Sequence, residues 1–292
     1  MQDFKRLKAR TLGAKFSRRN ALKLAAAAFL DGSLRAADAP LAFAALDHVE
    51  FTVSDVEKAL AFYVRIFGAT VMKNNQTSRR YIRVGSAYIA LDKAQQIRVD
   101  HFCAGIQEFD IAAVHALLQQ RGVAYRDFPS GKDLAVTDPD GIRAQLAVNN
   151  GWEQLKNGTA SPESVPGTEP IFRATGIDHI LLNVSDPEKS AEFYAKIFGP
   201  VSQRNNNRIW FQAGKSRVGL LKIPEGGRAG VNHYCVSATA FDYDTVVKKL
   251  TDAGAKVETP EAAGLPQFRD PDGFLIQVTG PSDRRPAVVT PR

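Results

Sequence analysis

Residues 46–68 read LDHVEFTVSDVEKALAFYVRIFG, and residues 177–199 read IDHILLNVSDPEKSAEFYAKIFG. The two stretches share Asp-His, Val-Ser-Asp, Glu-Lys, Phe-Tyr and Ile-Phe-Gly at matching positions. Such long-range repetition indicates that one structural unit occurs twice along the chain.

Two shorter pairs extend this repeat toward the C-terminus. VDHFC at 99–103 matches VNHYC at 231–235, and the tetrapeptide DPDG at 138–141 occurs again at 270–273. Both pairs have the same offset, one position longer than that of the first pair, so the second copy follows the first almost without insertion. The repeats predict two homologous domains, at 46–149 and 177–280.

Each predicted domain contains two modules of the same order: a strand, a helix and three further strands. The strand segments alternate with a period of two, whereas the helical segments place apolar residues three and four apart. Ser54 is the expected N-cap of the first helix and Gly68 its C-cap. The sequence therefore predicts an α+β fold made of four βαβββ modules. The elements expected in the first domain are strands at 46–53, 69–74, 79–84 and 87–93 with a helix at 55–67, then strands at 97–104, 124–128, 132–137 and 142–148 with a helix at 110–121.

The composition is that of a globular protein, with 44% hydrophobic and 24% charged residues. Two cysteines cannot make a disulfide framework. No run of about 18 or more apolar residues is present, so we expect no stable membrane insertion. A stretch rich in Gly, Pro, Ser and Thr predicts a linker at 150–175, and residues 281–292 resemble a loose tail.

The net charge of +7 comes from the N-terminal segment. Residues 1–35 contain nine Lys or Arg and two Asp, while basic and acidic side chains are equal in number over the rest of the chain. The body of the protein thus has no bulk electrostatic attraction to phosphates, and no nucleic-acid partner is expected.

Residues 1–39 have the features of an export signal. A basic region leads to Ser17-Arg18-Arg19-Asn20-Ala21-Leu22-Lys23 and then to an apolar stretch ending at Leu30. The paired arginines resemble a twin-arginine (Tat) signal, although Ala21 stands where a bulkier apolar residue is commoner. The resemblance implies a bacterial or archaeal protein that meets the Tat machinery and works in the periplasm or outside the cell. The alternative is a basic amphipathic helix of the mature protein.

Three strands of each predicted domain place a nitrogen or oxygen donor on the face away from the helices. Side chains alternate across a strand, and the opposite face is apolar. Four of the five histidines in the chain occupy these equivalent positions, so chance is a poor explanation. The donors are His48, His101 and Gln145 in the first domain and His179, His233 and Gln277 in the second.

The strand-borne Asp-His, the FY-x-x-IFG helix end, the second strand-borne His and DPDG together resemble the vicinal oxygen chelate superfamily, which includes glyoxalase I, extradiol dioxygenases and bleomycin-resistance proteins. The resemblance covers 46–149 and 177–280. It implies two tandem domains, each a cup-shaped mixed sheet covered by helices. In the dioxygenases, a His on the first strand of each module and a Glu on the last strand hold Fe(II) or Mn(II). By position, the implied metal ligands are His48, His101 and Gln145, and His179, His233 and Gln277.

The third ligand departs from the family pattern, because Gln stands where Glu is expected in both domains. A neutral carbonyl oxygen is a weaker ligand for a divalent cation than a carboxylate. The fourth-ligand position of the glyoxalases aligns near Ala90 and Gly219, which have no ligating group. Glu50 lies two residues from His48 on the same face and is a candidate for the missing charge, whereas Leu181 takes its place in the second domain.

Two functions follow from the resemblance. The first is a divalent-metal-dependent enzyme (Fe, Mn, Ni or Zn), extradiol-dioxygenase-like or glyoxalase-like, which acts on a small molecule with vicinal oxygens. The second is a metal-free protein that sequesters a small ligand, with its histidines as relics of a metal site. Cys103 and Cys235 are expected to be unpaired packing residues, with a thiolate ligand or nucleophile as the alternative. His115 is expected to be a surface or packing residue.

Overall fold

The computed structural model of the chain describes residues 41–280, apart from 168, 206, 240 and 259–264. The predicted export signal and the predicted C-terminal tail lie outside the described residues. Within the described part, no helix is both long and apolar enough to cross a membrane.

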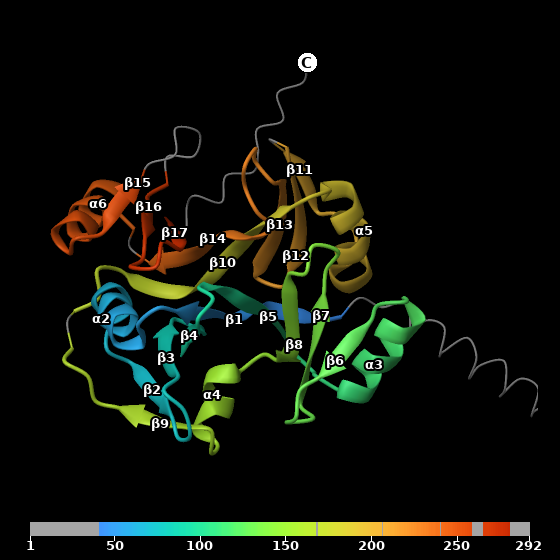
Figure 1. Cartoon of the computed structure of the whole chain (residues 1–292), viewed down its shortest axis with the longest axis horizontal. Helices are drawn as coiled ribbons and strands as arrows, with labels where there is room; N and C mark the ends of the chain where they lie inside the picture. Colours follow the sequence, from blue (N-terminus) through green and yellow to red (C-terminus); the bar gives the residue numbers. More distant parts are fainter. Residues whose placement is uncertain (1–40, 168, 206, 240, 259–264, 281–292) are drawn as a thin grey trace, which may run out of the picture. The chain divides into compact units, whose positions relative to one another are not determined.

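The first half of the described chain forms one mixed sheet with two helices (Figure 1). Its strands lie in the spatial order β2-β3-β4-β1-β5-β8-β7-β6. The two parallel pairs are β1 with β4 and β5 with β8, which are the first and last strands of each module. The elements are β1 (Phe43–Val53), α2 (Val56–Phe67), β2 (Val71–Asn74), β3 (Arg80–Val84), β4 (Ala87–Lys93), β5 (Arg98–Ile106), α3 (Ile111–Gln120), β6 (Tyr125–Asp127), β7 (Asp133–Thr137) and β8 (Arg143–Val148).

The second half repeats this sheet strand for strand. Its spatial order is β11-β12-β13-β10-β14-β17-β16-β15, again with parallel pairs between the first and last strands of each module. The four predicted βαβββ modules and the α+β class are thereby confirmed. The elements are β10 (Arg173–Val184), α5 (Pro187–Phe198), β11 (Gln203–Asn205), β12 (Arg208–Ala213), β13 (Ser216–Lys222), β14 (Gly230–Thr239), α6 (Tyr243–Asp252), β15 (Lys256–Glu258), β16 (Gln267–Arg269) and β17 (Leu275–Thr279).

Helix α2 begins one residue later than the sequence suggested. The side chain of Asp55 accepts hydrogen bonds from the backbone N–H groups of Glu57 and Lys58, so Asp55 and not Ser54 is the N-cap. The Ser54 N–H donates instead to Asp272 of the second half, at 3.2 Å. The prediction failed because Ser and Asp are both good N-cap residues, and the sequence alone does not distinguish between two such neighbours.

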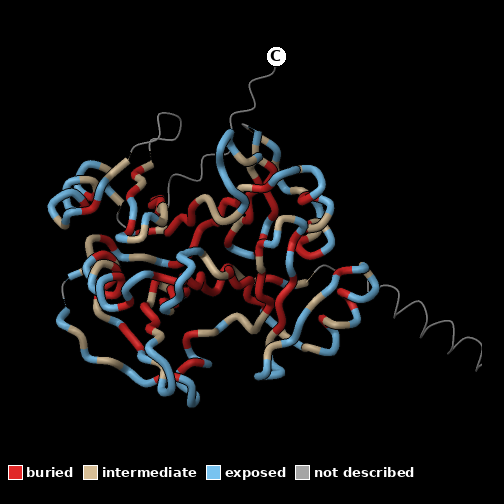
Figure 2. Tube along the Cα trace, in the orientation of Figure 1, coloured by how far each residue is buried: buried red, intermediate tan, exposed pale blue. Residues whose placement is uncertain are grey.

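Helices and central strands share one hydrophobic core that runs through both halves. Figure 2 shows the buried residues lying along the central strands, with exposed residues on the loops and the outer faces of the helices. Phe51 of β1 lies 5.5 Å from Tyr234 and 4.8 Å from Phe274, both in the second half. The two halves are therefore packed together through a common core.

Two tight turns, one in each half of the chain, lie very close to the backbone of the other half. Gly214, between β12 and β13, has a φ of +62°, and a Cβ there would lie 2.1 Å from the carbonyl oxygen of Ala44. Gly85, between β3 and β4, has a φ of +63°, and a Cβ there would lie 2.2 Å from the backbone of Thr175. Glycine is required at both turns because a side chain would separate the halves.

The segment predicted as a linker contains two regular elements. Helix α4 (Gly151–Lys156) follows β8, and β9 (Ala160–Glu163) pairs antiparallel with β2. Trp152 and Leu155 of α4 are buried in a second apolar cluster that includes Tyr88 and Met72. This cluster lies on the face of the first sheet that carries His48, because Tyr88 stacks on its imidazole ring.

Candidate metal centre

Strands β1, β5 and β8 bring three predicted ligands of the first half together. The Nε2 atom of His48 lies 3.2 Å from Nε2 of His101 and 3.0 Å from Oε1 of Gln145. Cross-strand pairing places them there, because His48 is opposite Cys103 and Cys103 is opposite Gln145. All three donor side chains are buried, with exposed fractions of 5–8%.

The hydrogen bonds around this trio fix the orientation of its three donor side chains. His48 donates through Nδ1 to Asp47 at 2.8 Å, and His101 donates through Nδ1 to Asp100 at 3.0 Å. When an imidazole that donates through Nδ1 is neutral, its Nε2 is the unprotonated, accepting nitrogen. The amide nitrogen of Gln145 donates to Asp133, which turns Oε1 toward His48.

This donor set fits a divalent cation. Three acceptors meet without a donor among the described side chains, and a positive charge between them removes their mutual repulsion. Two ligands about 2.1 Å from one ion and at right angles to each other lie about 3.0 Å apart, close to the observed spacings. Imidazoles held through Nδ1 by carboxylates are typical of metal-binding histidines.

A carboxylate lies beside the neutral trio. Glu50 is directly opposite His101 on β5, it is 7% exposed, and it pairs with Arg79 at 2.9 Å. On the other side, Glu50 is opposite Ala90, the position where glyoxalases carry a ligand on β4. The side chain of Glu50 thus supplies negative charge next to a position that has no ligating group.

Helix α4 completes the wall around His48. The Gly151 N–H donates to Oδ2 of Asp47 at 2.9 Å, while Oδ1 of Asp47 receives the imidazole N–H. Tyr88 stacks on the His48 ring at 4.4 Å, and Trp152 packs against Tyr88. Gly151, in the segment predicted as a linker, therefore fixes the position of Asp47, and Asp47 orients His48.

The second half repeats the imidazole pair but not its charged surroundings. The Nε2 atoms of His179 and His233 lie 3.2 Å apart, with Nδ1 bound to Asp178 and to Asn232. Gln277 is opposite Cys235 in the pairing, as Gln145 is opposite Cys103. Burial lowers the pKa of both imidazoles; for His233, the neighbouring His179 and then Arg208 lower it further, to about 3.

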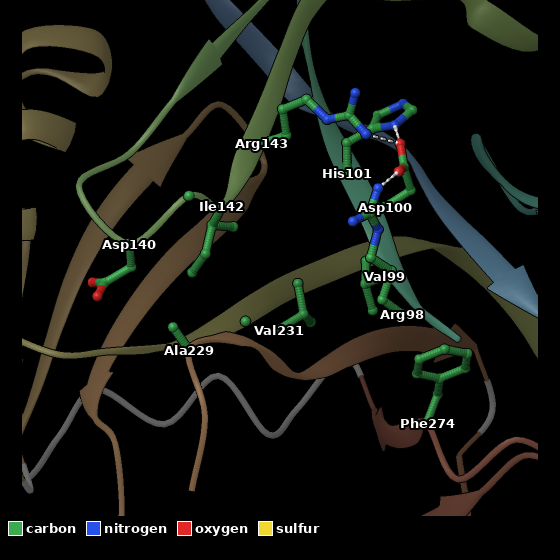
Figure 3. A pocket seen from close by; sticks show the side chains of 12 residues that line it. Arg98, Val99, Asp100, His101, Asp140, Ile142, Arg143, Ala229, Val231 and Phe274 are labelled. Atoms are coloured by element: carbon green, nitrogen blue, oxygen red, sulfur yellow. Dashed lines mark hydrogen bonds and ion pairs between the residues drawn. The ribbon is translucent and has the colours of Figure 1, made fainter. Parts of the chain in front are cut away.

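A cavity of about 440 Å³ lies beside His101 (Figure 3). Asp100 accepts hydrogen bonds from Arg98, His101 and Arg143 on its wall. These three donors hold the pKa of Asp100 far below its ordinary range, so it is a carboxylate at neutral pH. From the second half, Ala229, the first two residues of β14 and Phe274 also line the cavity.

The two cysteines and His115 lie in surroundings that favour a structural role over a catalytic one. Cys103 and Cys235 are buried and form no disulfide, as expected, and burial raises the pKa of the Cys103 thiol well above its ordinary value. A protonated thiol is a poor nucleophile, which favours a packing role. His115 pairs with Asp127 at 2.7 Å on α3, away from both imidazole pairs.

Sequence reasoning missed the residues that orient the ligands. In three of the four cases the signal was present, because an Asp directly precedes His48, His101 and His179. The contacts of Asp133 and Gly151 had no comparable signal, since they depend on a hairpin and on a helix inside the predicted linker.

Residues 45–146 and 176–278 match the description Glyoxalase/Bleomycin resistance protein/Dioxygenase superfamily. The chain therefore belongs to this superfamily, to which the vicinal oxygen chelate resemblance pointed. Its relatives include a metallothiol transferase FosB of Lysinibacillus sphaericus, 34% identical over 123 residues, which are 38% of this chain and 86% of the relative.

Solved structures share the fold at low sequence identity. The Mn(II)-bound glyoxalase from Novosphingobium aromaticivorans has a TM-score of 0.62 and 16% identity, covering 82% of this chain and 83% of that one. A catechol 2,3-dioxygenase has a TM-score of 0.63 and 14% identity, covering 85% and 91%. These similarities support the tandem arrangement of the modules, and all three similar proteins are enzymes by name.

Proposed function

We propose that the protein is a divalent-metal-dependent enzyme whose metal binds in the first half. The observation that carries the proposal is that Nε2 of His48 lies 3.2 Å from Nε2 of His101 and 3.0 Å from Oε1 of Gln145, three atoms that are all acceptors when the imidazoles are neutral and donate through Nδ1. The proposed metal is Fe, Mn, Ni or Zn. The second set, His179, His233 and Gln277, stays a prediction.

The substrate class we propose is a small molecule with neighbouring oxygens, such as a catechol-like or hydroxy-carbonyl compound. A divalent ion, when bound, polarises both oxygens and stabilises negative charge that develops on them. The chain contributes the neutral imidazoles, the carboxylate of Glu50 and a largely enclosed face lined by Tyr88. The family relationship to glyoxalases and dioxygenases supports this class, and the metallothiol transferases add group transfer as a related chemistry.

The cavity beside His101 is the proposed binding place for the rest of the substrate. Arg98 and Arg143 present guanidinium groups there, and Asp100 fixes both of them. Asp100 also holds His101, so one carboxylate positions a metal ligand and two cationic side chains. A substrate with an acidic substituent is favoured by this arrangement.

The direct test is metal analysis of the purified full-length protein. We expect about one equivalent of a transition metal per chain, and removal with a chelator should be reversed by adding the metal. His48→Ala or His101→Ala should weaken binding at least about 100-fold, since each removes a ligand. His115→Ala is the matched control, because that histidine lies on α3 and should leave binding unchanged.

The opposite result defines the alternative. A folded protein that binds none of the four metals, in its wild-type form and at neutral pH, would overturn the proposal. The metal-free sequestering function would then be the better interpretation. Oxygen uptake and product formation with catechols and hydroxy-carbonyl compounds would be measured on the same loaded protein.

We also propose that residues 1–39 direct the chain to the Tat machinery for export to the periplasm or beyond. The support is the sequence Ser17 to Lys23, with Arg18 and Arg19 at its centre. Replacing both arginines by lysine should keep the protein in the cytoplasmic fraction. Equal export of the wild-type and variant chains would contradict this route.

A further inference from the structure

The second half keeps an arginine after losing both of its acidic partners. In the first half, Arg79 pairs with Glu50 at 2.9 Å and with Asp92 at 2.7 Å. The equivalent arginine is Arg208, because Tyr81 is opposite Ala90 on β4 in the way that Trp210 is opposite Gly219 on β13. The same pairing places leucines at both carboxylate positions. These replacements are Leu181 for Glu50 and Leu221 for Asp92.

Arg208 has no counter-charge in the described structure. It forms no ion pair with a described carboxylate, and its Nε atom is buried without a hydrogen-bond partner among the described residues. A buried guanidinium nitrogen without a partner is costly, since water cannot replace the missing bond. Arg208 lies two residues before Trp210 on β12, so both side chains are on the same face of the strand, and the ring of Trp210 contacts His179 of the imidazole pair.

A second guanidinium lies nearby. Arg217 takes the position of Tyr88, pairs with Asp178 at 3.0 Å and lies 4.8 Å above the ring of Trp210. Trp210 in turn contacts the edge of His179. Arg217 is partly exposed and uses one nitrogen toward Asp178, which leaves further N–H donors for a ligand.

The other acidic residues of the first site are also replaced. Asn232 stands for Asp100, and Leu265 stands for Asp133 at the same offset as the repeated DPDG. Among the described residues around the second imidazole pair, two arginines stand against the single carboxylate of Asp178, whereas the first site has an excess of carboxylates. This balance disfavours a cation and favours an anion.

We propose that the second half binds a small oxyanion, such as the phosphate or carboxylate group of a ligand, through Arg208 with Arg217 beside it. The oxygens of the anion accept from the guanidinium groups and not from His179 or His233, whose Nε2 atoms are acceptors. Arginine suits this ligand because its planar N–H donors match two oxygens at once. The two halves of the chain thus differ in the sign of the charge they recognise.

Trp210 provides the readout. The chain has two tryptophans, so a Trp152→Phe background leaves the emission of Trp210 as the reporter of the second site. The full chain would be titrated with inorganic phosphate and, separately, with acetate, at constant ionic strength. We expect a saturable change in Trp210 emission, and the tighter of the two anions identifies the class of oxyanion.

Matched arginine variants test the assignment. Arg208→Gln should weaken anion binding at least about tenfold, and Arg208→Lys should restore part of it because the charge returns without the planar fork. Arg79→Gln is the internal control, since Arg79 already pairs with Glu50 and Asp92, and it should change the affinity less than about twofold. Circular dichroism and thermal melting of each variant confirm that it is folded.

The proposal is overturned if neither anion gives a saturable change, or if Arg208→Gln and Arg79→Gln have the same effect. Repeating the titration on His48→Ala separates it from the proposed function. Anion binding that persists in this variant, while metal binding is lost, shows that the second site acts independently. If the first half binds no metal at all, the anion titration is still decisive.

Discussion

At the scale of single residues, the first site depends on charge that its three donors lack. His48, His101 and Gln145 are all neutral, whereas family members with a Glu in the third position place a negative charge on the ion itself. Among the described residues, Glu50 is a buried carboxylate beside them that is not hydrogen-bonded to a ligand, and it pairs with Arg79, which also pairs with Asp92. The affinity for a divalent cation should therefore depend on Glu50.

Glu50→Gln should lower the affinity for Mn(II) about 10- to 100-fold, because the isosteric amide removes the charge without removing a residue from the strand. Isothermal titration with Mn(II) measures the change. Glu57→Gln is the control, since that carboxylate is 71% exposed on α2. Equal affinities for Glu50→Gln and the wild type would show that the charge comes from another group.

The contact between Gly151 and Asp47 gives a second prediction at this scale. A Cβ at Gly151 would lie 2.2 Å from Oδ1 of Asp47, so Gly151→Ala must displace the carboxylate that fixes His48. We expect metal affinity to fall about tenfold in a folded protein. Gln154→Ala, on the exposed side of the same helix, should have no effect. A Gly151→Ala protein with wild-type affinity would show that Asp47 does not orient the ligand.

Much of the site was predictable from residues that repeat. His48 and His179, with His101 and His233, stand out because both copies carry them at strand positions on the same face. The two halves differ at the position of Glu50, where the second half has Leu181, so the repeat could not indicate a role for Glu50 at the site. The role of Asp47 depends on a backbone N–H from α4, and no side-chain pattern encodes such a contact.

At the scale of elements, the period of the apolar residues predicted the strands and helices closely: two in strands, and three to four in helices. The helix boundaries were predictable because an Asp or Ser precedes each predicted helix and a Gly follows it. The exceptions are the N-cap of α2 and the elements α4 and β9. The sequence of 150–175 is rich in turn-forming residues, yet pairing with β2 and burial of Trp152 make part of it regular.

The cap of α2 can be tested directly. Asp55 accepts two backbone hydrogen bonds, so Asp55→Ala should cost about 1 kcal/mol of the free energy of unfolding. Ser54→Ala should cost less than about 0.5 kcal/mol, because only the backbone of Ser54 bonds to Asp272. Denaturant unfolding of both variants gives the comparison. A larger loss for Ser54→Ala would restore the sequence-based assignment of the cap.

At the scale of the whole molecule, the two halves exchange a reciprocal pair of hydrogen bonds. The Tyr63 hydroxyl of α2 donates to Asp270 at 2.8 Å, and the Tyr194 hydroxyl of α5 donates to Asp138 at 3.1 Å. The tyrosines belong to the repeated Phe-Tyr and the aspartates to the repeated DPDG. These repeats therefore serve contact between the halves, a role that could not be assigned before the halves were placed together.

The pH dependence of these contacts follows from their burial. Burial raises the pKa of Asp138 and Asp270 above the ordinary 3.8, while the tyrosine hydroxyl of each pair opposes that rise. Because the pKa of each carboxyl is higher in the folded than in the unfolded protein, its protonated form adds to the free energy of unfolding. This contribution is fully present below pH 3.8 and is lost as the pH rises through the folded-state pKa. Each tyrosine limits this loss, because its O–H stabilises the ionised carboxylate.

Replacing both tyrosines by phenylalanine should thus destabilise the protein more at neutral than at acid pH. We expect a loss of about 1 kcal/mol per site below pH 3.8, where the carboxyls hold their protons, and about 2 kcal/mol per site at pH 7, where two buried charges lose a donor. Unfolding by denaturant across this pH range measures the difference. Tyr125→Phe, which removes a hydroxyl bonded to the exposed Gln119, should change stability little at either pH. A loss for the double variant that stays constant with pH would mean that the hydroxyls do not stabilise the ionised carboxylates and serve packing alone.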